Sequence, residues 1–246
     1  MKRTIIAFIA LSLLLSACVY PNDVTFSSTI IEGSGNVVRE ERPVMGITEV
    51  NLNGFGDLII MQGEKEELVI EADDNILSYL TTEMHGPRLD IGVKSSYSLK
   101  SIKTIRYYLT VRDLNAVRIS GFGDVEIADL ETPSLEIRLS GTGDIDLRDL
   151  QSDSLKVTIS GFGNATVTGE VIRQEVVLSG SGNYTASDLK SRETRIRISG
   201  FGNSELWVTD ELDVTISGSG DLDYYGSPHI QQSMSGFGSI NSRGEK

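Results

Sequence analysis

The sequence predicts an all-β protein, a right-handed parallel β-helix (solenoid) with about 20 residues per coil. Three observations predict this fold. A five-residue glycine motif recurs at a nearly constant spacing, the residues between the motifs alternate between apolar and polar, and no repeat has room for a crossover helix. A fixed short period indicates a solenoid in which each coil stacks on its neighbours.

The motif is Ser-Gly-x-Gly, followed by Asp or Asn in six of seven copies. The first glycines of successive copies lie 20, 20, 19, 20, 18 and 18 residues apart. Glycine adopts positive φ freely, and Asn or Asp tolerates it, so each copy predicts a tight turn. A phosphate-binding loop is excluded because no helix follows the motif. The copies are residues 120–124, 140–144, 160–164, 179–183, 199–203, 217–221 and 235–239, with earlier echoes at 33–36 and 53–57.

The segments between the motifs have the period of a β-strand. Leu135, Ile137 and Leu139 are apolar, whereas Glu136 and Arg138 between them are charged. This alternation predicts strands with one buried face. A coil of this length has a perimeter of about 60 Å, which suits a filled β-helix. A β-sandwich and a propeller with two repeats per blade are the alternative folds. For the β-helix, a right-handed winding is expected because crossovers between parallel strands are almost always right-handed.

Residues 1–17 resemble the signal peptide of a bacterial lipoprotein. Lys2 and Arg3 precede an apolar stretch, 4–15, that is too short for a permanent membrane span. The stretch ends in Leu-Ser-Ala-Cys, which resembles a lipobox, and Cys18 is the only cysteine of the chain. We therefore expect Cys18 to be lipidated and to anchor the chain in a membrane, with a buried free thiol as the alternative. Val19, and not Asp, follows the cysteine, which resembles the enterobacterial sorting signal for the outer membrane. In a Gram-positive source, the anchor would lie in the outer leaflet of the plasma membrane.

The rest of the chain divides into three parts. Residues 18–36 are expected to form a lipid-anchored tether, and 37–112 a strand-rich N-terminal part that starts the coil and covers its apolar end. Residues 113–243 hold the repeats. Within the N-terminal part, we expect one or two helical turns at 73–80 and a polar loop at 94–103.

Composition limits the possible partners. The chain has 22 Lys+Arg against 35 Asp+Glu, a net charge of -13, which argues against a nucleic-acid partner. One cysteine excludes an internal disulfide, and two histidines argue against a multi-histidine metal site. We expect no cofactor.

Calcium is the sharpest candidate for site chemistry. The last motif residue forms a column of Asp and Asn, in which Asp124 and Asp144 would stack on neighbouring coils. Close carboxylates repel each other, and a hard cation with oxygen ligands relieves that repulsion. Half of the six positions are Asn, however, which favours a turn without metal.

No catalytic set can be assembled from the sequence. His85 precedes Gly86-Pro87 and His229 follows Pro228, so both are expected in exposed turns. Carboxylates are spread over every coil instead of being paired. We therefore expect no enzymatic activity. A polysaccharide-acting enzyme is the least favoured hypothesis.

The variable motif residue alternates between large and small along the repeats. Phenylalanine occupies every second copy, and Thr or Ser the copies between. If each ring leans over its small neighbour, the alternation is a packing solution. The other interpretation is an exposed aromatic stripe that binds sugar rings. We favour packing.

Residues 49–57 and 69–75, together with the repeated motif, resemble the putative auto-transporter adhesin head GIN-domain family. The resemblance covers about residues 37–243. It implies a β-helical fold in a secreted or lipid-anchored bacterial protein, and it carries over no catalytic residue.

The sequence thus predicts a lipid-anchored cell-envelope protein, a non-enzymatic adhesin-like or scaffold module. Its expected partners are the membrane, through Cys18, and an envelope glycan or protein; self-association through an uncapped coil end is a further possibility. The alternative function is calcium-dependent glycan binding.

Overall fold

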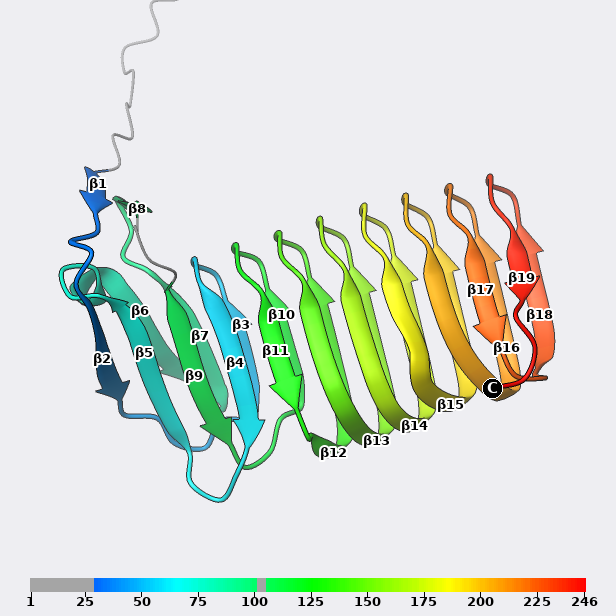
Figure 1. Ribbon diagram of the computed structural model, residues 1–246, viewed down its shortest axis with the longest axis horizontal. Coiled ribbons are helices and arrows are strands. Elements are labelled where there is room, and N and C mark those ends of the chain that lie inside the picture. The colour runs from blue at the N-terminus through cyan, green and yellow to red at the C-terminus, as the bar shows by residue number, and fades with distance from the viewer. Residues whose placement is uncertain (1–28, 101–104) are drawn as a thin grey trace, which may run out of the picture.

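The described residues, 29–100 and 105–246 of a computed structural model, fold into a row of stacked coils (Figure 1). Neighbouring coils pair in parallel throughout the repeats, so the predicted parallel β-helix is confirmed and the antiparallel sandwich is wrong. The right-handed winding stays a prediction. Within these residues the one helical element is a 3-10 turn, η1 (Leu77–Tyr79), in the segment where helical turns were expected. No helix in the described part is long and apolar enough to cross a membrane.

The strands are short near both ends and long in the repeats. They are β1 (Thr29–Glu32), β2 (Val37–Arg42), β3 (Glu49–Leu52), β4 (Asp57–Gln62), β5 (Glu67–Asp73), β6 (Leu80–His85), β7 (Arg88–Val93), β8 (Tyr97–Lys100), β9 (Arg106–Val111), β10 (Ala116–Ile119), β11 (Val125–Ala128), β12 (Glu131–Leu139), β13 (Ile145–Ile159), β14 (Ala165–Leu178), β15 (Tyr184–Ile198), β16 (Ser204–Ile216), β17 (Leu222–Tyr225), β18 (His229–Met234) and β19 (Ile240–Ser242).

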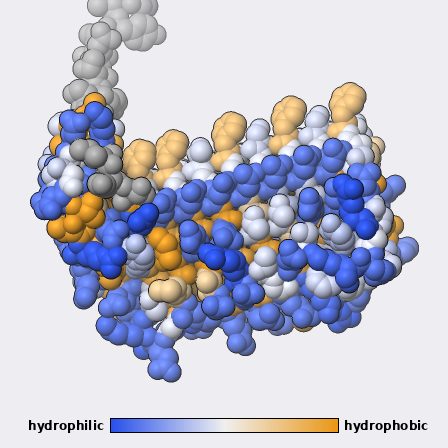
Figure 2. Space-filling view, viewed as in Figure 1, coloured by the Kyte–Doolittle hydropathy of each residue, from blue (hydrophilic) through white to orange (hydrophobic). Residues whose placement is uncertain are grey.

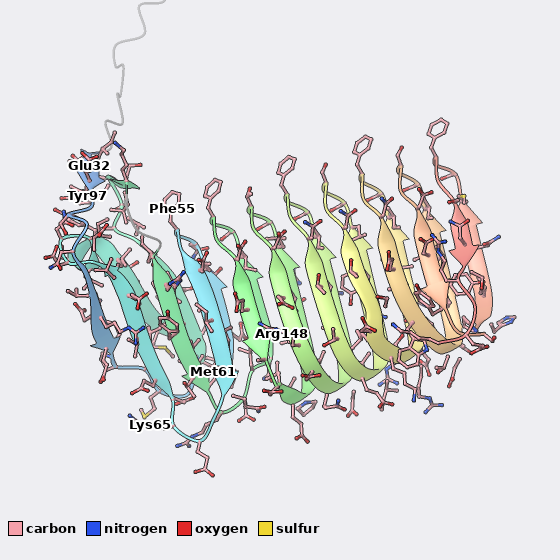
Figure 3. All side chains as sticks on the ribbon, viewed as in Figure 1. Glu32, Phe55, Met61, Lys65, Tyr97 and Arg148 are labelled. Atoms are coloured by element: carbon pink, nitrogen blue, oxygen red, sulfur yellow. The ribbon has the colours of Figure 1, made fainter. Side chains whose placement is uncertain are left out.

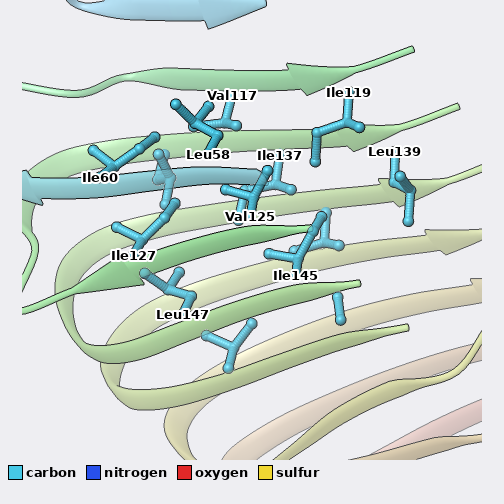
Figure 4. Packing of buried hydrophobic residues seen from close by; sticks show 14 of the residues in the cluster. Leu58, Ile60, Val117, Ile119, Val125, Ile127, Ile137, Leu139, Ile145 and Leu147 are labelled. Carbon is cyan, nitrogen blue, oxygen red and sulfur yellow. The ribbon is translucent and has the colours of Figure 1, made fainter. Parts of the chain in front are cut away.

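Each coil consists of a strand, the glycine turn and a second strand that bends into the next coil. Equivalent residues stand in register: Ile137 pairs with Val157, Val157 with Val176, Val176 with Ile196, and Ile196 with Val214. All five side chains are fully buried. The inward positions therefore form continuous aliphatic columns that fill the solenoid (Figure 4).

The first coil is interrupted by the N-terminal part of the chain. β3 pairs with β10 on one side and β7 on the other, and β4 pairs with β11 and β9 in the same way. The echo at 53–57 is therefore a true glycine turn, and Phe55 bridges to Phe122 of the first repeat. Between these two coils the chain builds the end of the solenoid and then returns.

That end is closed by antiparallel pairing. β5 runs antiparallel to β2 and β9, and β6 antiparallel to β7, so the stack of parallel coils stops there. The outermost strand, β2, presents charged side chains such as Arg39, which pairs with Glu71 at 2.7 Å. Charged residues on an edge strand discourage pairing with another chain. The expected capping role of this region is confirmed.

Two segments differ from the sequence prediction. Thr29–Glu32, within the expected tether, forms β1, and Tyr97–Lys100, within the expected polar loop, forms β8. The two strands pair in parallel, and Lys100 forms an ion pair with Glu32 at 3.0 Å. Each strand is stabilised by a partner far away in the sequence, which local polarity does not reveal. The predicted signal peptide and Cys18 lie outside the described residues.

The glycines of the turns are required mainly by the close approach of neighbouring coils. A Cβ on Gly161 would overlap the carbonyl oxygen of Gly141. In all the other repeats too, a Cβ on the first glycine would overlap a backbone carbonyl oxygen of the preceding coil. Phe162 N donates to Gly141 O at 3.0 Å, so the two backbones cannot separate without losing hydrogen bonds. The expected positive φ occurs at the second glycine of four turns (56, 123, 143 and 163), but not at the first. A need for positive φ therefore does not by itself explain why the motif contains two glycines.

Replacing Gly161 by alanine tests this constraint. We expect Gly161→Ala to lower the free energy of unfolding by about 3 kcal/mol, the upper end of the usual overpacking cost, because backbone must move. Gly92→Ala is the control, since its Cβ would meet only the Thr81 hydroxyl at 3.2 Å. Urea unfolding followed by circular dichroism measures both. Equal losses would show that close approach is not the reason for glycine.

Candidate functional site

A row of phenylalanine side chains projects from the glycine turns into solvent. This phenylalanine row consists of Phe55, Phe122, Phe162, Phe201 and Phe237, with exposed fractions of 41%, 57%, 66%, 70% and 85%. Figure 2 shows apolar knobs standing along the turn edge above a polar surface, and Figure 3 shows the rings upright on the turns. Packing against the small neighbours was the favoured sequence interpretation, and it is wrong.

The physical reason lies in the turn itself. The variable residue stands between two glycines at the tip, where there is no partner layer for it to pack against, and its column points out of the solenoid. The core consists of aliphatic side chains with a few buried tyrosines, and every phenylalanine among the described residues belongs to the row.

The alternation sets the spacing of the rings. Successive variable residues are bridged in parallel, as Phe162 to Ser181 and Ser181 to Phe201. Coils lie about 4.8 Å apart, so these rings are about 10 Å apart. Phe55 and Phe122, on adjacent coils without a small residue between, stack with centroids 5.5 Å apart and planes 9° apart. The Thr and Ser positions thus prevent the later rings from covering each other's faces.

Beside the row runs a second column, which we call the Asx ladder. In this ladder, the side-chain oxygen of each residue accepts a hydrogen bond from the backbone N–H of the equivalent residue in the next coil along the chain. Asp144 N donates to Asp124 Oδ1 at 2.8 Å, and Asn203 N donates to Asn183 Oδ1 at 2.9 Å. The interpretation of these residues as turn residues is confirmed, and the hydrogen bonds also connect coils. The members are Asp57, Asp124, Asp144, Asn164, Asn183, Asn203 and Asp221.

The calcium candidates Asp124 and Asp144 do lie on adjacent coils, as the sequence predicted. One oxygen of each is engaged by the ladder, because Asp144 Oδ1 accepts from Asn164 N at 2.7 Å. In the described part of the chain, no group of three or more His, Cys, Asp or Glu side chains is placed to hold a metal ion.

The two histidines are exposed, as expected. His85, at the end of β6, lies 3.6 Å from carboxylate oxygens of Glu83 and Asp90. Asp90 is already held by Arg88 and Asn51. Burial opposes its charge, but these hydrogen bonds outweigh burial and hold the pKa of this carboxyl below its ordinary value. Asp90 is therefore a stable anion in an ion-pair network and is poorly suited to proton transfer near neutral pH.

An open acidic hollow of about 730 Å³ lies at the bends opposite the turns. It is lined by Glu131, Asp153 and Glu170, with Arg192 at one side. No sequence pattern indicates this hollow, because its residues come from bends of irregular composition. Arg192 is paired with Asp210 at 2.9 Å.

The ladder generates a prediction about calcium. Asn keeps the acceptor oxygen of Asp, so Asp124→Asn combined with Asp144→Asn retains the hydrogen bonds between coils. We expect the melting temperature to stay within about 2 °C of the parent, since surface changes of this kind alter stability by at most about 0.5 kcal/mol. We also expect millimolar calcium to leave the parent's melting temperature unchanged. Differential scanning calorimetry with and without calcium measures both melting temperatures. A rise in the parent's melting temperature with calcium that the double variant lacks would establish a metal site.

Comparison with known proteins identifies the family to which the chain is similar. Residues 46–228 match the family described as "Putative auto-transporter adhesin, head GIN domain". No curated protein matches.

Solved structures show the same architecture. A putative adhesin from Bacteroides fragilis is 25% identical, with a TM-score of 0.83 over 86% of this chain and 99% of its own. A structure from Parabacteroides distasonis, described as a putative lipid binding protein, is 28% identical, with a TM-score of 0.72 over 87% of this chain and 99% of its own. A putative adhesin from Parabacteroides merdae, 19% identical with a TM-score of 0.67 over 87% of this chain and 99% of its own, shares the fold.

Proposed function

Because the chain belongs to the family of putative auto-transporter adhesins with a head GIN domain, we propose that it is a lipid-anchored, non-enzymatic binding module of the cell envelope. Its contact surface is the phenylalanine row. In this proposal, the solenoid is a rigid support, and the row is the part that meets a partner.

The exposed row is the observation that carries the proposal. An apolar side chain in water gains free energy when a partner covers it, at about 25 cal/mol for each Å². Five aromatic rings stand in a single line, three of them more than 60% exposed, with only Thr or Ser between the later ones. Soluble proteins keep such a row when it serves binding. The adhesin description of the Bacteroides fragilis structure supports a role in contact.

A binding role is preferred to catalysis because the exposed chemistry is repeated from coil to coil. Catalysis needs a unique juxtaposition of reacting groups. His85 lies against Glu83 and Asp90, and Asp90 is already paired with Arg88. In the acidic hollow, Arg192 is paired with Asp210. The family description supports the same preference.

The anchor follows from Cys18, which stands after a lipobox-like sequence. Acyl chains on this residue hold the solenoid at the envelope, in the outer membrane of a Gram-negative source. Two acyl chains suffice for stable attachment, since each buried CH₂ contributes about 0.8 kcal/mol.

Removing the thiol tests the anchor. We expect Cys18→Ala to shift the protein from the membrane fraction to the soluble fraction, or to leave it as an uncleaved precursor, because no thioether can form. Metabolic labelling with palmitate and detergent phase separation measure this. Labelling of the alanine variant as strongly as the parent would contradict the proposal.

Removing the rings tests the contact surface. The row variant carries Phe162→Ser, Phe201→Ser and Phe237→Ser, each matching the serine that natural copies of the turn contain. We expect it to bind isolated envelope preparations at least tenfold more weakly than the parent, because each lost anchor costs about 1 kcal/mol or more. Sedimentation of purified protein with envelopes gives the ratio.

The matched control removes three exposed apolar side chains away from the turns. This off-row variant carries Met45→Ser, Met61→Ser and Ile172→Ser, at residues that are 83%, 49% and 37% exposed. Met61 lies near the opposite edge of the solenoid (Figure 3). Envelope binding should match the parent. Equal weakening in both variants would mean that general stickiness, and not the row, causes binding.

A further inference from the structure

We infer that the phenylalanine row rests on the lipid surface to which Cys18 ties the chain, so that the solenoid lies along the membrane with its turn edge toward the lipid. This inference rests on the proposed function and names the partner of the same surface. The partner is the surface of a bilayer rich in zwitterionic lipid.

The chain enters the fold at the edge that carries the row. β1 begins at Thr29 and lies at the level of the glycine turns, on the same side of the solenoid as the row (Figure 1). Cys18 precedes Thr29 by 11 residues. A chain of this length reaches at most about 40 Å, at about 3.6 Å per residue. The anchor therefore pulls on the turn edge and keeps it near the membrane.

The row and the tether have comparable lengths. From Phe55 to Phe237, seven parallel bridges connect eight turns. At about 4.8 Å per coil, the row is about 34 Å long, comparable to the maximal reach of the tether. The glycine turns stand in one nearly straight row (Figure 1), so the solenoid can lie with the whole row toward one surface. Ile30 on β1, 67% exposed, adds an apolar side chain near the entry point.

The rings stand at the tips of the turns and project into solvent. Phe55 and Phe122, on adjacent coils, are stacked with ring planes 9° apart, and each covers part of the other. Apolar side chains of this kind, presented in a row, are suited to enter between lipid headgroups, where Phe buries at the boundary with the acyl chains.

Charge decides which lipids fit. No turn of the row contains Lys or Arg, and the adjacent Asx ladder includes Asp57, Asp124, Asp144 and Asp221. Carboxylates this close to the surface repel anionic headgroups and tolerate zwitterionic ones, whose ammonium groups they can pair with. Binding should therefore weaken as anionic lipid is added, and salt should restore it because repulsion is screened.

The experiment uses residues 19–246 without acyl chains, so that any binding to lipid comes from the folded protein and not from the anchor. This fragment keeps every described strand and the whole core. Vesicles of phosphatidylcholine and phosphatidylethanolamine are floated with the parent fragment and the row variant. The parent should float with the vesicles, and the row variant should bind at least tenfold more weakly while keeping its melting temperature. Replacing one third of the lipid by phosphatidylglycerol should reduce parent binding severalfold at low salt.

The off-row variant is the matched control and should float like the parent. Flotation of the row variant equal to the parent would overturn the inference. So would a parent that ignores vesicles but binds envelopes through the rings; that result leaves the proposed function standing with another partner. A parent that dimerises without lipid in sedimentation equilibrium, and loses the dimer in the row variant, would assign the row to a second copy. If the rings affect neither vesicles nor envelopes, both proposals fail.

Discussion

The contact between backbones at the glycine turns is the constraint on which the rest of the structure depends. Gly161 meets the carbonyl oxygen of Gly141 where a Cβ would lie, and Phe162 N donates to the same oxygen at 3.0 Å. The coils are thereby locked at the spacing of hydrogen-bonded strands. Since a coil can neither tilt nor slip at its turn, the inward residues below it stay in register, and the aliphatic columns follow.

The same lock turns each motif position into a column with one physical role. The Asx position supplies an oxygen for the next coil's N–H, as Asp124 does for Asp144. The variable position supplies a side chain to solvent, and the order of Phe and Ser along the chain becomes a spacing in space. A single turn of this sequence would have no such property. The row is therefore a feature of the stack and exists only because the coils cannot move relative to each other.

The sequence predicted well whatever is repeated locally. The period, the turn positions and the inward face at Leu135, Ile137 and Leu139 all follow from residues within one coil. It failed where a distant partner decides, as for β1 and β8, which stabilise each other across the cap. It also failed for the direction of the phenylalanine side chains, because strand alternation does not extend into a turn. The anchor at Cys18 stays a prediction.

The faces of the solenoid explain why the edge is the better candidate for contact. Charged side chains on the faces pair between coils, as Lys156 does with Glu175 at 3.3 Å and Arg195 with Asp213 at 2.9 Å. Such exposed pairs add little stability, but they leave fewer uncompensated charges for a partner. Covering a face would also require removing water from paired ions, which costs free energy. Covering the row removes water from aromatic carbon, which is favourable. A partner therefore gains most at the turns.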